Sequence, residues 1–163
     1  MSRPRSSTLA LTAALVCGVS LACGGAPPTG SVNSPAAAPS LLRPVASVDQ
    51  VMDGIIIPAS QRVFDAVVYV NGELQQVPKN DDEWFAVQMQ ALAVAEAGNL
   101  LMMPPRAKDT GDWMTASRAM TDSAYRVAQA AEAKNTDLML TTGGEMYNAC
   151  TACHEKYLTM PEP

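Results

Sequence analysis

The residues best suited to chemistry lie near the end of this 163-residue chain, in the sequence Cys150-Thr151-Ala152-Cys153-His154. This C-x-x-C-H pattern is typical of covalent haem attachment, in which two thiols bond to the porphyrin and the adjacent imidazole binds the iron. On a helix the two cysteines would share one face, with the histidine directly after them. The pattern predicts one covalent haem c on Cys150 and Cys153, with His154 as an axial iron ligand.

Three other uses of the motif have to be weighed. A thioredoxin-like dithiol follows a strand and opens a helix, whereas this pair comes at the end of a helical pattern. A structural zinc site needs a fourth ligand, and His154 is the only histidine in the sequence. A simple disulfide would leave His154 without a role. Covalent haem uses all three side chains, and a thiol oxidoreductase without haem is kept as an alternative.

Composition favours an all-α fold. Alanine and the 10 methionines are plentiful, while aromatic residues make up only 5% of the chain and β-branched residues are few, which suits helices better than sheets. The balance of 11 basic against 16 acidic residues gives no cationic surface that could neutralise phosphates. Nucleic acid is therefore not an expected partner.

The N-terminal residues predict export. Two arginines precede an apolar run in residues 1–22, which has the pattern of a signal peptide. The sequence Ser20-Leu21-Ala22-Cys23-Gly24-Gly25 resembles a bacterial lipobox, which predicts cleavage before Cys23 and lipidation of this cysteine. Ser20 stands where leucine is usual, so cleavage without lipidation, or a transmembrane anchor, remains open. The expected location is the periplasmic or extracellular side of a membrane.

The chain after the signal divides into a linker and one domain. Residues 23–46 are rich in Gly, Pro, Ala and Ser and predict a flexible tether. Residues 47–163 are predicted to form the haem-binding domain. Loss of the two signal arginines leaves 9 basic against 16 acidic residues, so the exported chain is acidic.

Helical periodicity predicts four helices within this domain. The first has Ser47 as N-cap and contains Pro58, which predicts a kink or a break. Its inward residues are expected to be Val48, Met52, Ile55, Ile56, Ala59 and Val63. The second follows the Asn80/Glu83 capping box and stops before Pro104-Pro105, with Trp84, Val87, Ala91, Val94, Ala95 and Leu101 inward.

The third and fourth helices complete the pattern. The third is predicted from Trp113, Ala116, Met120, Ala124, Val127 and Ala131, and the fourth from Leu138, Met146, Ala149, Cys150, Cys153 and Tyr157. Short connections predict an antiparallel four-helix bundle. Between the first two helices, Asn71-Gly72 predicts either a small hairpin or a helix end followed by irregular chain.

A C-x-x-C-H motif in the last helix of a four-helix bundle, followed by Glu155-Lys156-Tyr157, resembles the cytochrome c′ type, the class II c-type cytochromes. The resemblance extends over Ser47 to Leu158 in the expected arrangement of helices, but only the terminal motif is specific to the family. Two features depart from it: Leu158 stands where many relatives have a basic residue, and Gly143-Gly144 precedes the motif.

The resemblance implies two kinds of function, which differ at the sixth position of the iron. Some relatives leave it open and bind small gases, while others fill it with methionine and carry electrons. Met52, on the inward face of the first helix, is the candidate sixth ligand by this resemblance. Core packing is its alternative role, and the rival methionines are Met89, Met102, Met103, Met114 and Met120.

The expected function is one-electron transfer by a membrane-tethered cytochrome, with a nitric oxide or carbon monoxide sensor or scavenger as the alternative. An enzyme is not expected. A haem peroxidase would need a second histidine as distal acid/base, and the sequence has only one histidine. Expected partners are redox proteins with basic docking surfaces, and the membrane through the lipid anchor. A homodimer is left open by the sequence. Arg106 and Lys108 are candidates for a haem propionate or solvated loop charges.

Overall fold

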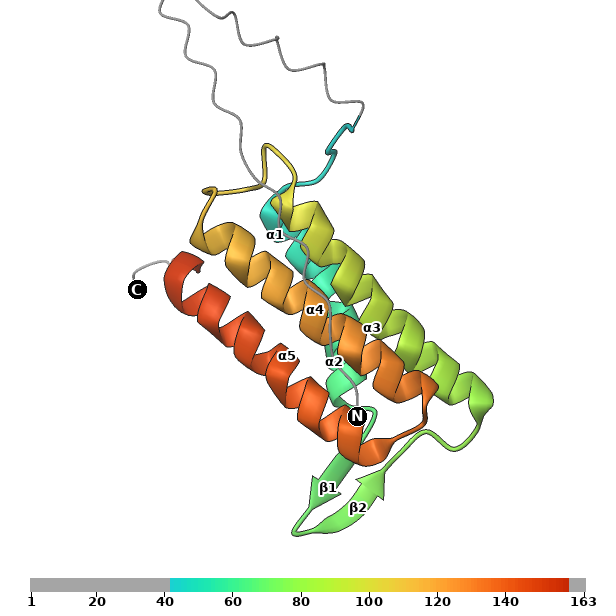
Figure 1. Ribbon diagram of the computed structural model, residues 1–163. Coiled ribbons are helices and arrows are strands. Elements are labelled where there is room, and N and C mark those ends of the chain that lie inside the picture. Colours follow the sequence, from blue (N-terminus) through green and yellow to red (C-terminus); the bar gives the residue numbers. More distant parts are fainter. Residues whose placement is uncertain (1–41, 159–163) are drawn as a thin grey trace, which may run out of the picture. The chain divides into compact units, whose positions relative to one another are not determined.

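The computed structural model describes residues 42–158 (Figure 1). The predicted signal peptide 1–22, the lipidation site Cys23 and most of the predicted linker 23–46 lie outside the described residues. So do residues 159–163. The described residues fall in one compact unit, which consists of helices and one small hairpin.

The first helical stretch is continuous but changes register twice. It consists of α1 (Val48–Val51), a π-helical turn η1 (Met52–Ile56) and α2 (Ile57–Phe64). Ser47 is its N-cap, as predicted: the Ser47 hydroxyl accepts from the Gln50 amide at 3.2 Å, and the Gln50 side chain accepts from the Ser47 amide at 2.9 Å. This capping box satisfies two amides that the helix leaves without partners.

The break expected near Pro58 takes the form of this π turn. Ile57 donates its amide to the Met52 carbonyl, five residues back, and Pro58 then lies at the start of α2, where a missing N–H costs least. The wider turn rotates the residues around it relative to an α-helix. Ile56 is consequently buried but Ile55 is 37% exposed, so the prediction that Ile55 faces the core was wrong.

Three long helices complete the bundle: α3 (Asp81–Met102), α4 (Asp112–Glu132) and α5 (Thr136–Tyr157). The predicted cap of α3 is present, since Asn80 accepts from the Glu83 amide at 2.9 Å. Leu138 is 42% exposed and does not face the core as predicted, because it lies in the first turn of α5, where Asn135 caps its amide.

The four helical units pack antiparallel (Figure 1). α3 packs against both α4 and the first helical stretch, whereas α5 packs extensively against α4 alone within the described chain. The all-α four-helix fold is therefore confirmed. The seam between the first stretch and α5 is the least tightly packed side of the bundle.

A two-stranded hairpin connects α2 to α3, as one of the two interpretations of Asn71-Gly72 predicted. β1 (Val68–Val70) pairs antiparallel with β2 (Glu73–Gln76). Asn71 and Gly72 have φ of 53° and 82°, and positive φ at both central residues is what a type I′ turn requires. In Figure 1 the hairpin lies at the opposite end of the bundle from the C-terminal end of α5.

α3 and α4 lie close together at Gly98, and this leads to a prediction. A Cβ on Gly98 would lie 2.1 Å from Thr121 Oγ1 and 3.1 Å from the Ser117 carbonyl. Thr121 cannot turn away without losing its hydrogen bonds to the carbonyls of Ala95 and Ser117. Gly98→Ala should therefore lower the free energy of unfolding by roughly 1–3 kcal/mol, although alanine is the better helix former.

Urea unfolding followed by circular dichroism would measure this effect. Gly143→Ala is the matched control, because Gly143 lies inside α5 and a Cβ there would meet nothing within 4 Å. The control should gain about 0.5–1 kcal/mol from helix propensity. Equal effects of the same sign at both glycines would contradict the close packing at Gly98.

Candidate functional site

One small cavity is enclosed by all four helical units. Its wall is formed by Met52 and Ile56 of η1, Leu101 of α3, Ala116, Ser117 and Met120 of α4, and Ala149, Cys150, Cys153 and His154 of α5. The wall is mainly apolar, and the space between the side chains is about 20 Å³, enough for about one water molecule. The fold thus brings the predicted Met52 and the C-x-x-C-H motif, far apart in sequence, to one place.

The motif occupies the last two turns of α5. Met139, Thr142 and Met146 form the buried side of this helix, and Cys150 and Cys153 continue it at helical spacing. Both thiols are half-buried and neither forms a disulfide. His154 is exposed at the edge of the cavity.

The environment of the cysteines disfavours thiolate chemistry. Burial raises the pKa of both thiols above the ordinary 9.0, and for Cys150 the neighbouring Cys153 adds to the effect. The thiols also lie at the C-terminal, negative end of a helix dipole rather than at the N-terminal end that would stabilise a thiolate. Reactive dithiols are usually found under the opposite conditions.

The end of α5 is held in place by the loop between α3 and α4. The Tyr157 hydroxyl donates to the Asp109 carboxylate, and Lys156 pairs with Asp112. The Tyr157 ring also packs edge-on against Trp113, with centroids 5.0 Å apart. Trp113 is fixed in turn by its indole N–H, which donates to the Leu101 carbonyl at 2.8 Å. These contacts fix the turn that carries His154.

The contact between Tyr157 and Asp109 depends on pH. The hydrogen bond from Tyr157 holds the pKa of Asp109 below its ordinary 3.8 and raises the pKa of Tyr157. The stabilisation is therefore present above the unfolded pKa of the carboxyl and is lost as pH falls through its lower folded pKa. Asp109 is exposed and Tyr157 is only partly buried, so this effect is small.

Ser117 is a cavity residue that the sequence analysis missed. It is 2% exposed, and its Oγ has no hydrogen-bond partner in the described chain. A signal was present in the sequence, because Ser117 is a polar residue on the apolar stripe of Trp113, Met120 and Ala124. A lone serine on such a stripe is usually satisfied by its own helix, so the pattern alone does not single it out.

The structure also distinguishes among the rival methionines and the two basic residues that the sequence singled out. Of the rival methionines, Met120 lines the cavity and the other four do not. Arg106 is not a solvated loop charge: it is 6% exposed and donates to the carbonyls of Ala46 at 2.8 Å and Leu100 at 3.1 Å. Lys108 is exposed.

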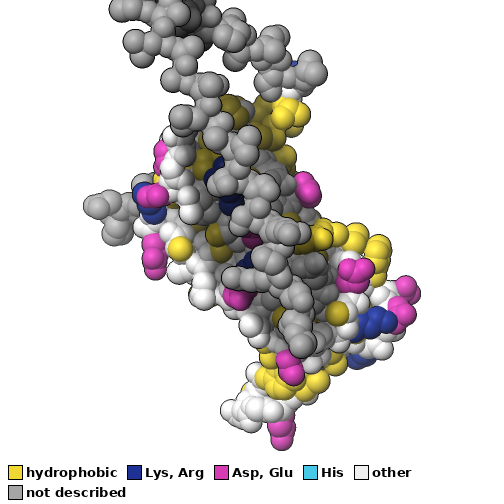
Figure 2. Space-filling model, in the orientation of Figure 1, with side chains coloured by type: hydrophobic (Ala, Val, Ile, Leu, Met, Phe, Trp, Pro, Cys, Tyr) yellow, Lys and Arg dark blue, Asp and Glu magenta, His cyan; other side chains and the backbone are white. Residues whose placement is uncertain are grey.

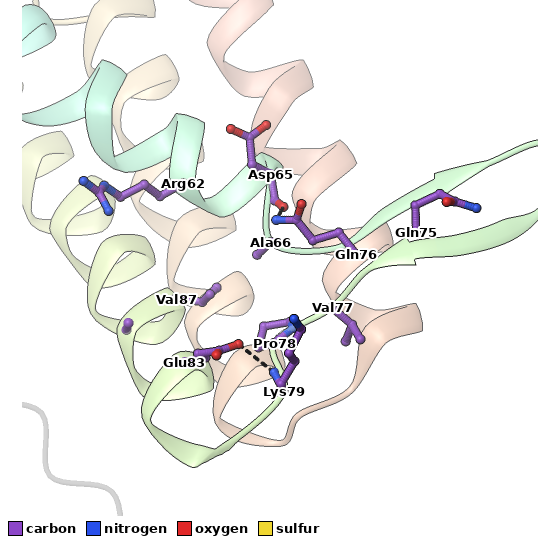
Figure 3. A pocket seen from close by; sticks show the side chains of 11 residues that line it. Arg62, Asp65, Ala66, Gln75, Gln76, Val77, Pro78, Lys79, Glu83 and Val87 are labelled. Atoms are coloured by element: carbon purple, nitrogen blue, oxygen red, sulfur yellow. Dashed lines mark hydrogen bonds between the residues drawn. The ribbon is translucent and has the colours of Figure 1, made fainter.

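A larger hollow lies near the hairpin, away from the motif. It has a volume of about 630 Å³ and is formed by the end of α2, β2 with the chain after it, and the start of α3. Figure 3 shows Arg62, Asp65 and Lys79 around it, with Glu83 bound to the Lys79 amide. Charges of both signs are mixed along this open surface, and it contains neither a thiol nor an imidazole.

On the face shown in Figure 2, acidic side chains are spread over the visible surface. No described helix has the length and apolar character needed to cross a membrane. Within residues 42–158 no group of three or more His, Cys, Asp and Glu side chains is arranged to hold a metal ion.

The residues of the cavity fit haem c by their chemistry. Two thiols one turn apart, an adjacent imidazole and apolar walls are what covalent haem attachment uses, and the unpartnered Ser117 hydroxyl marks the wall as incomplete. A porphyrin needs more room than the cavity offers. The seam between η1 and α5 is the side of the cavity with the weakest packing, because α5 packs extensively only on α4 among the described elements.

Comparison with known proteins gives no assignment. No family model, no curated protein and no solved structure matches the chain. A functional conclusion therefore has to come from the residues of the cavity.

Proposed function

We propose that this protein is a monohaem c-type cytochrome of the cytochrome c′ type that carries single electrons. The observation that supports this most directly is the shared cavity of Met52, Cys150, Cys153 and His154. Met52 comes from the opposite end of the domain from the motif, and no short-range sequence pattern forces it next to Cys150, Cys153 and His154.

Each residue has a distinct role in this proposal. Cys150 and Cys153 would hold the porphyrin through thioether bonds, and His154 would be an axial ligand of the iron. Met52 is the proposed sixth ligand, which would keep the iron low-spin and raise its reduction potential. The haem supplies the ferric/ferrous chemistry, and the protein binds, orients and shields it.

Location and partners follow from the sequence and are part of the proposal. Export and lipidation at Cys23 would tether the domain to the periplasmic or extracellular side of a membrane. The acidic balance of the chain favours redox partners with basic docking surfaces. Nucleic acid is not a proposed partner, and a homodimer remains open.

Absorption spectra of the oxidised and reduced protein test the function. The full chain, made in a host that attaches c-type haem, should give the spectrum of a low-spin haem and cycle reversibly between a chemical reductant and an oxidant. Protein that carries no haem under these conditions would overturn the proposal.

The alternative function is binding of nitric oxide or carbon monoxide at an open iron position. One observation favours it: Ser117 places an unpartnered hydroxyl at a mainly apolar cavity, where a small ligand of the iron could accept its hydrogen bond. A high-spin spectrum and ready carbon monoxide binding in the wild-type protein would make this alternative the better account.

A further inference from the structure

The hydroxyl of Ser117 is oriented in a way that its own helix does not explain. Three other hydroxyls in α4 donate to the carbonyl four residues earlier: Thr115 to Gly111, Thr121 to Ser117, and Ser123 to Ala119. This is the usual bond of a helical serine or threonine. Ser117 makes no such bond to Trp113, although it is as deeply buried as Ser123.

A buried hydroxyl nearly always has a hydrogen-bond partner. Ser117 Oγ has none among the described residues, and Ser117 lines the cavity that contains the motif. The potential acceptors in that cavity are sulfur atoms and an imidazole, together with whatever group enters it. The orientation of Ser117 therefore indicates a partner that belongs to the occupied state of the cavity.

The position of Ser117 indicates which side of the iron this partner is on. His154 is at the exposed edge of the cavity, whereas Ser117 belongs to its buried wall together with Leu101 and Met120. If His154 binds the iron from the exposed side, the buried wall surrounds the opposite, sixth position.

We propose that Ser117 donates a hydrogen bond to the sixth ligand of the haem iron. In the electron carrier this acceptor is the Met52 sulfur, and in a form with an open iron it is the outer atom of a small iron ligand such as carbon monoxide. This inference rests on the proposed function. A hydrogen bond to the Met52 sulfur draws electron density from it, which weakens its donation to ferric iron and raises the reduction potential.

The first test compares the haem-loaded full-length protein with two serine variants. Ser117→Ala should lower the reduction potential while the iron stays low-spin. Ser123→Ala is the matched control, because Ser123 is an equally buried serine of the same helix whose hydroxyl is satisfied by the carbonyls of Ala119 and Met120. The control should leave the potential unchanged. An unchanged potential in Ser117→Ala would count against the bond to sulfur.

The second test opens the iron with Met52→Ala and uses carbon monoxide as the probe. Adding Ser117→Ala to this variant should weaken carbon monoxide binding about two- to tenfold, the effect of one hydrogen bond, and raise the stretching frequency of the bound gas. Adding Ser123→Ala should change neither. If neither the potential nor carbon monoxide binding responds to Ser117→Ala, the inference is wrong.

Thermal unfolding of the full chain made without haem gives an independent readout. Ser123→Ala should lower the melting temperature because it breaks two internal hydrogen bonds, whereas Ser117→Ala should not, because it removes a hydroxyl without a partner. An equal loss in both variants would show that Ser117 is satisfied within the protein and would overturn the inference. If a host that attaches c-type haem yields protein without haem, the proposed function is wrong, and this inference is wrong with it.

Discussion

Replacement of Met52 by leucine is expected to convert the iron from low-spin to high-spin. Leucine keeps the volume of the side chain but has no sulfur to bind iron, so packing should change by less than about 1.5 kcal/mol while coordination is lost. Absorption spectra and electron paramagnetic resonance of the purified ferric protein would measure the change. Met52→Ala should in addition leave space for carbon monoxide on the ferrous iron.

Met120→Leu is the matched control. Met120 is the other methionine in the cavity wall, but it comes from α4 and is 5% exposed, deep in the core. This variant should remain low-spin. A reversal of the two results would assign the sixth position to Met120, and a wild-type protein that is already high-spin would make Met52 a packing residue.

Replacing Cys150 and Cys153 together by alanine should abolish covalent haem. In the wild-type protein the haem should remain with the polypeptide after acid denaturation and extraction with organic solvent, because thioether bonds survive this treatment. In the double variant no haem should be retained. Denaturing electrophoresis followed by staining for haem peroxidase activity measures both results on the same gel.

Circular dichroism is the control for folding of this variant. Both cysteines are only half-buried and lie in the last two turns of α5, so their truncation should leave most of the helix content intact. Met52→Leu should keep its stained band, because it leaves the thioethers in place. Haem that is extracted from the wild-type protein would contradict covalent attachment.

Much of the fold was predictable because local and long-range signals agree. Ser47 and Asn80 cap helices where predicted, and Asn71-Gly72 supplies the two positive φ values of a tight hairpin turn. Caps and turns depend on side chains within a few residues, so one sequence is enough to recognise them. The same holds for the motif around Cys150.

Other features depend on contacts that no local pattern reveals. Pro58 predicts a break in the first helix, but a proline alone does not indicate that the break is a π turn with Ile55 exposed. The contact between Tyr157 and Asp109 joins residues 48 positions apart. Ser117 gave no prediction, because its missing hydrogen bond is visible only once the neighbouring helices are in place.

The buried side chain of Arg106 bears on how far from the membrane the proposed haem could lie. It binds the carbonyl of Ala46, just before the first helix, to the loop that also holds Tyr157 through Asp109. The start of the domain, where the predicted linker joins it, and the end of α5 that carries His154 are therefore both held by the same loop. If the chain carries the proposed anchor at Cys23, a linker with the length of residues 23–46 could span at most roughly 80 Å when fully extended. The end of the domain that would carry the proposed haem would then stay within reach of the membrane surface, where it would meet membrane-bound redox partners more often than freely diffusing ones.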